Sequence, residues 1–155
     1  MKTFFRDRFT VWFVSGIAGS ALKDAFGLFT LWIGFSNYHI VQVAADIFLD
    51  KPHLGMVGGI LIGIVADFSM GGLFGLAIGA LLEWQGFDNH LLKGAVIALG
   101  VWMLLIGIIM HSLTQVFDLT LRQPNDIANS MICHLLFGIS VAYFIVRLTH
   151  WVQRG

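Results

Sequence analysis

Four long apolar segments, separated by short polar connectors, constrain the fold of this chain more than any other feature of its sequence. They cover residues 9–35, 54–84, 91–117 and 127–151. Each is longer than the roughly 20 residues with which an α-helix crosses about 30 Å of hydrocarbon. Only 12% of all residues are charged, about half the share typical of a soluble domain. The pattern predicts an all-α fold, a four-helix transmembrane bundle that forms one domain over residues 1–155.

A shorter segment between the first two spans, residues 37–53, has the pattern of an amphipathic helix. Pro52 is expected to end it. We predict that this helix lies on the membrane surface or forms a protruding end of the first span. Its apolar face consists of Ile40, Val43, Ala44, Ile47 and Phe48.

The positions of Lys and Arg predict the orientation in the membrane. Six of them fall on the side that holds both predicted termini and two on the opposite side. Because cytoplasmic segments carry an excess of Lys and Arg, we expect a multi-pass protein of the plasma membrane with both termini in the cytoplasm. The basic start resembles a signal peptide, but the apolar residues resume after Asp24, so we interpret it as a retained first span. The formal net charge of zero does not indicate a nucleic-acid partner.

The second span carries a small residue at every fourth position, in the stretch "GMVGGILIGIVADFSMGGLFGLAIG" (55–79). This spacing lets helix backbones approach closely. Each four-residue step overshoots a turn by about 40°, so the two ends of the column face directions roughly 160° apart and need different neighbours. Those neighbours belong either to the same chain or to a second subunit. The predicted packing glycines are Gly55, Gly59, Gly63, Gly71, Gly75 and Gly79, with Gly19 and Gly27 in the first span.

Asp67 occupies the centre of this glycine column, roughly 20 Å into the span and so near the membrane midplane. An ionised carboxylate at that depth needs a partner. Lys23 and Asp24 lie at a similar depth in the first span, also among small residues. We therefore predict a buried Lys23–Asp67 pair with Asp24 as a third member. The pair is either a proton or ion relay or a fixed ion pair that sets helix register.

Two histidines lie at a shared depth nearer the external side. His111 continues a polar stripe that begins at Asp118, and His134 lies in the fourth span. Three interpretations remain open: a hydrogen bond between helices, an external vestibule that relays protons, or ligation of haem iron. A metal site would lack a third ligand at that depth, so no metal is predicted, and haem b is the alternative to no cofactor. The predicted vestibule consists of Thr114, Gln115 and Asp118.

Three stretches resemble small bacterial four-helix integral membrane proteins that are themselves uncharacterised. They are "GIAGSALKD" (16–24), "LLKGAVIALGVW" (91–102) and "HLLFG" (134–138). The resemblance implies a four-helix fold and a bacterial membrane location, and it implies no activity.

No phosphate-binding loop, nucleophile elbow or zinc-protease motif occurs in the sequence, so we do not expect an enzyme. The leading hypothesis is a small homo-oligomeric membrane protein that moves protons, ions or a small solute through Lys23, Asp24 and Asp67. The alternative is a non-catalytic accessory subunit of a larger membrane complex that assembles through its glycine faces. A third hypothesis is a b-type haem or quinone protein in electron transfer.

Overall fold

A computed structural model describes residues 7–105 and 123–153, and all regular elements in these two ranges are helices. The predicted all-helical class is confirmed for this part of the chain. The elements are α1 (Arg8–Trp32), α2 (Ile40–Asp46), the 3₁₀ turn η2 (Lys51–His53), α3 (Val57–Gln85), α4 (His90–Trp102) and α6 (Pro124–Gln153).

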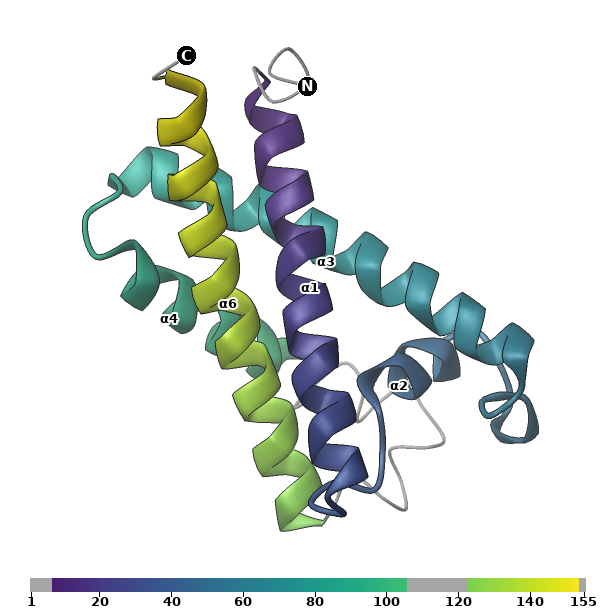
Figure 1. Ribbon diagram of the computed structural model, residues 1–155. Coiled ribbons are helices and arrows are strands. Elements are labelled where there is room, and N and C mark those ends of the chain that lie inside the picture. The colour runs from purple at the N-terminus through teal and green to yellow at the C-terminus, as the bar shows by residue number, and fades with distance from the viewer. Residues whose placement is uncertain (1–6, 106–122, 154–155) are drawn as a thin grey trace.

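Helices α1 and α6 lie side by side and run in opposite directions, so that α1 begins and α6 ends at the same end of the molecule (Figure 1). Helix α3 crosses α1 obliquely, and α2 packs against α3 near the start of α3 (Figure 1). Helix α4 packs against α6. The chain thus forms a central α1–α6 pair with α3 and α4 packed against it.

The described helices begin and end within about three residues of the predicted spans wherever both ends are described. Residues 33–35 were expected to continue the first span, but α1 ends at Trp32. Gly34 adopts a positive φ of 74°, and the carbonyl of Thr30 accepts the N–H groups of Phe35 and Ser36. This left-handed turn ends the helix. In the third span, α4 and a π-helical turn reach Leu105, and residues 106–117 lie outside the described ranges.

The amphipathic segment is helical over α2, and its predicted apolar face is buried only in part. Val43 of that face is buried, and so are Val41 and Ala45 outside it, whereas Ile47 and Phe48 are exposed. Helix α2 packs directly on α3, where the carbonyl of Val41 lies against Gly63. This tertiary contact accounts for the buried residues outside the predicted face.

Two described helices, α3 and the Pro124–Thr149 part of α6, are long and apolar enough to cross a membrane. Both helices leave several large apolar side chains exposed, α3 more than α6. In the most apolar 18-residue stretch of each helix, 22% of the residues of α3 and 33% of those of α6 are buried. Large side chains such as Leu61, Val65 and Leu73 point outward from α3.

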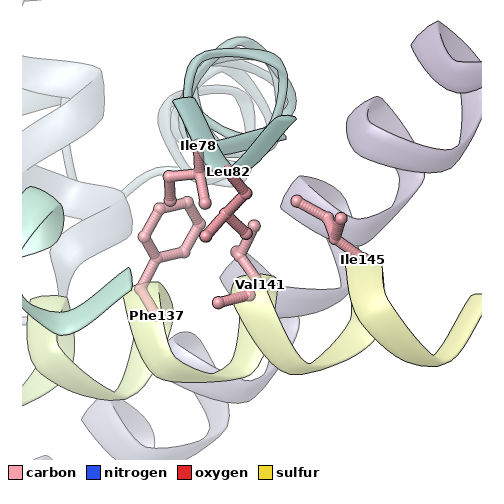
Figure 2. Close-up of a cluster of buried hydrophobic side chains, with 6 residues drawn as sticks. Ile78, Leu82, Phe137, Val141 and Ile145 are labelled. Atoms are coloured by element: carbon pink, nitrogen blue, oxygen red, sulfur yellow. The ribbon is translucent and has the colours of Figure 1, made fainter. Parts of the chain in front are cut away.

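The hydrophobic core lies where α3 meets α6. Figure 2 shows Ile78 and Leu82 of α3 directed toward Phe137, Val141 and Ile145 of α6. Leu82 and Ile145 are fully buried. Burying a side chain of this size stabilises a fold by about 1.5–3 kcal/mol in water, and this contact fixes how α3 lies over the α1–α6 pair.

Candidate functional site

The charged residues predicted at the membrane midplane meet in one buried cluster. Nζ of Lys23 in α1 lies 2.5 Å from Oδ1 of Asp67 in α3 and 3.2 Å from Oδ1 of Asp24. The Lys23 side chain is 6% exposed and that of Asp67 is 10% exposed. The structure therefore brings together the three residues that the sequence singled out, and we call them the charged cluster.

Glycines make this approach of α1 and α3 possible. The backbone of Gly16 lies against Gly71 and Gly72, and that of Gly75 lies against Trp12 and Gly16. A side chain on either face would overlap backbone atoms of the other helix. Since Lys23 lies two turns beyond Gly16 on α1, this contact sets its distance from Asp67.

The predicted packing glycines fall against several neighbours within the chain. Gly59 lies against His53 and Leu54, and Gly63 lies against Val41, so the first half of the column packs on α2 and η2. The second half packs on α1, with Ser20 at Gly71 and the Trp12 ring at Gly79. Contacts with a second subunit stay a prediction.

Three of the predicted packing glycines do not take part in the contacts of α3 with α1, α2 or η2. Gly19 packs on Val141 of α6, and Gly27 lies near the imidazole of His39. Gly55 was predicted to pack, but it lies in the exposed turn before α3 with no neighbour in reach of a Cβ. The preceding turn at Pro52 delays the start of the helix, which leaves Gly55 outside the column.

The charged cluster has more negative than positive charge when all three groups are ionised. Moreover, Oδ2 of Asp67 and the hydroxyl of Ser20 are buried and have no hydrogen-bond partner among the described residues. Oδ1 of Asp24 has the ionic contact with Lys23 but no hydrogen bond. Leaving such groups unsatisfied costs about 1–3 kcal/mol each, so the cluster has unused capacity to bind a proton or a hydrogen-bond donor.

A cavity of about 270 Å³ lies beside the charged cluster. Lys23, Asp67, Ser20 and His134 are its polar lining residues. The rest of the lining is apolar and comes from α2, α3, α4 and α6, including Ile40, Val43, Ala44, Ile47, Phe74, Ile78, Ile97, Val101 and Phe137. The apolar stripe predicted on α2 thus lines this cavity in large part.

His134 lines this cavity from α6. Its Nδ1 lies 2.8 Å from the carbonyl oxygen of Ser130, which can only accept, so Nδ1 donates the hydrogen. Nε2 is then an acceptor in the neutral ring, and no described residue donates to it. The predicted facing partner His111 and the vestibule residues Thr114, Gln115 and Asp118 lie outside the described ranges.

His39 is a part of the site that sequence reasoning missed, because it lies outside the predicted spans, in the segment between the first two. It is buried, and its Nδ1 accepts the N–H of Val41 at the start of α2. Its Nε2 therefore donates to the carbonyl oxygen of Asp24, 3.1 Å away. His39 thus links α2 to the backbone of the charged cluster.

Asp126 is a second missed residue. It is fully buried at the start of α6. Oδ1 accepts from the Ser36 hydroxyl at 2.9 Å and from the N–H of Asn37 at 2.8 Å, and Oδ2 accepts from the Asn37 amide at 3.0 Å. These bonds join the end of α1 to the start of α6. The available signal was weak: an acidic residue directly after Pro124, where a helix is expected to begin.

Within the described part of the chain, no three His, Cys, Asp or Glu side chains form a group that could hold a metal ion. Comparison of the chain with protein-family models, with curated proteins and with solved structures finds no match. The charged cluster and the cavity beside it are therefore the features of the described chain that bear on its function.

Proposed function

We propose that this chain is a multi-pass membrane protein that carries protons across the bilayer through Lys23, Asp24 and Asp67. One observation supports this proposal above all: a buried cluster that holds one amine and two carboxylates beside a cavity. In a low-dielectric interior, the excess negative charge is costly unless a proton or a cation neutralises it. A site that must gain and release a proton is what a relay requires.

The membrane setting is supported by the exposed apolar faces of α3 and α6, which would be costly in water. We propose that α1, the segment that begins with α4, and these two helices cross the bilayer. Helix α1 begins and α6 ends at the same end of the molecule (Figure 1), which supports placing both termini on one side of the membrane. We propose from the Lys and Arg distribution that this side is the cytoplasm.

The experiment is a proton-flux measurement in proteoliposomes that contain an internal pH-sensitive dye. With a pH gradient imposed, we expect the purified protein to dissipate the gradient at least tenfold faster than empty vesicles. Asp67→Asn, which removes the charge and keeps the shape, should return the rate to that of empty vesicles. Asp88→Asn, at an exposed carboxylate between α3 and α4, is the matched control and should keep the wild-type rate.

The assembly of each variant must be checked by gel filtration in detergent. A folded Asp67→Asn protein with the wild-type rate would refute the relay. A wild-type protein no faster than empty vesicles would do the same, and the charged cluster would then be a fixed ion pair in an accessory subunit.

A further inference from the structure

We infer that the cavity beside the charged cluster binds a small apolar molecule with a single ammonium group, which takes the place of the proton there. This inference deepens the proposed function and rests on it for its role in transport. Three observations support it: the cavity itself, the separation of its apolar lining from its few polar lining residues, and the buried polar atoms of those residues that have no hydrogen-bond partner among the described residues.

The volume limits the size of the ligand. A cavity of about 150 Å³ can hold benzene. The present volume of about 270 Å³ is therefore sufficient for a molecule of roughly ten or eleven non-hydrogen atoms by the same ratio. Most of the lining consists of aliphatic and aromatic side chains such as Val43, Phe74 and Ile97, so most of the ligand must be apolar.

The polar lining determines the charge of the ligand's head. Asp67 is nine-tenths buried, its Oδ1 is taken by Lys23, and its Oδ2 has no partner among the described residues. His134 leaves Nε2 as an acceptor, and the Ser20 hydroxyl, also unpartnered, can accept as well. Oδ2 of Asp67 and the Ser20 hydroxyl are buried, so both side chains must turn toward the cavity before their oxygens can accept from a ligand. An acceptor set of this kind favours a ligand head that donates hydrogen bonds. An ammonium group donates three and carries the positive charge that the cluster lacks.

The charged and titratable groups near the proposed position of the ammonium group come from three helices. Helix α1 contributes Lys23 and Asp24, α3 contributes Asp67, and α6 contributes His134. His39, before α2, contacts the cluster through the carbonyl oxygen of Asp24. The α4 residues that line the cavity are apolar. In the proposed function, a proton neutralises the excess negative charge of the cluster. A bound ammonium group neutralises the same charge, so its binding is expected to release that proton.

The test is isothermal titration calorimetry of the full chain in detergent with three probes of similar size. They are 2-phenylethylamine, which is cationic at neutral pH, neutral 2-phenylethanol and anionic phenylacetate. We expect the amine to bind at least tenfold more tightly than the alcohol, and the anion not to bind. Repeating the amine titration in buffers of different ionisation enthalpy should show about one proton released for each molecule bound.

Two variants locate the binding. Asp67→Asn should lower amine affinity at least tenfold and leave alcohol affinity within threefold. Ala44→Phe places a ring from α2 into the cavity and should abolish binding of both probes. Ala80→Phe adds the same ring at an exposed position of α3 and should leave both affinities unchanged. Thermal unfolding of each variant shows whether it is folded.

Equal affinities for amine and alcohol, tighter binding of the anion, or unchanged amine binding by folded Asp67→Asn would each overturn the inference. The proton-flux assay keeps this failure separate from failure of the proposed function. Proton flux without amine binding would mean that the ligand class is wrong and the relay stands. Amine binding without proton flux would mean that the cavity is a binding site and the relay is wrong.

Discussion

The backbone of Gly16 in α1 lies directly against the backbone of Gly71 in α3, and a methyl group on Gly16 would overlap the Gly71 carbonyl oxygen. Backbone atoms in two packed helices cannot move aside as a flexible side chain can. The two helices must therefore separate if either glycine gains a side chain. Because the charged cluster joins the same two helices, its geometry depends on this contact.

Gly16→Ala should lower the free energy of unfolding by about 1–3 kcal/mol, the usual cost of overpacking a tight contact. Gly100→Ala is the matched control, because Gly100 is in α4 with open space around it. There the added methyl group should raise the free energy of unfolding by about 0.5–1 kcal/mol, because alanine is more favourable than glycine inside a helix. Thermal unfolding in detergent, followed by circular dichroism, measures both. Equal effects of the two substitutions would contradict the close contact.

The charged cluster predicts an unequal response to the loss of its members. Asp67→Asn leaves Lys23 balanced by Asp24, so it should cost little stability. Lys23→Met leaves two buried carboxylates side by side without a cation and should cost about 3–5 kcal/mol. Adding Asp67→Asn to Lys23→Met should recover part of this loss, because one of the two like charges is then removed. Unfolding curves of the three variants give their free energies of unfolding. A Lys23→Met protein that is more stable than the Asp67→Asn protein would contradict the prediction.

Asp126 should behave as a structural residue. Asp126→Ala leaves the buried donors of Ser36 and Asn37 without their acceptor, and each such loss costs about 1–3 kcal/mol. We expect a loss of about 2–4 kcal/mol in unfolding free energy and faster amide hydrogen exchange at the end of α1. Asp50→Ala, at an exposed carboxylate, is the control and should change neither. Unchanged exchange around Asn37 in Asp126→Ala would mean that these bonds do not hold α1 to α6.

The charged cluster could be predicted from the sequence because few groups at its depth are ionisable. A lysine and an aspartate that both replace small residues in apolar helices have a strong physical reason to meet. The two-neighbour prediction for the glycine column rests on helix geometry in the same way. The structure places α2 and α1 at its two halves.

The missed contacts depend on loops whose path no periodicity specifies. His39 and Asn37 lie between α1 and α2, and they reach Asp24 and Asp126 because Gly34 turns the chain back toward the helices. Helical periodicity also predicted only part of the buried face of α2, because a short helix packed on α3 buries whichever side meets it. The contact of Gly94 with Gly138 between α4 and α6 was missed, although Ala98 and Ala142 follow these glycines at the four-residue spacing typical of close helix packing.

The exposed side of α3 provides a test of the membrane setting that does not depend on the charged cluster. Val65 lies in the first half of α3, two residues before Asp67, and is 66% exposed in the isolated chain. If α3 crosses a bilayer, Val65→Cys in a Cys133→Ala background should react with a water-soluble maleimide at least tenfold more slowly in proteoliposomes than in denaturant. Asp88→Cys, in the exposed connector after α3, should react rapidly in detergent-permeabilised vesicles in the same background. A Val65→Cys protein labelled as fast as Asp88→Cys would show that this face of α3 meets water, and would contradict its placement against lipid.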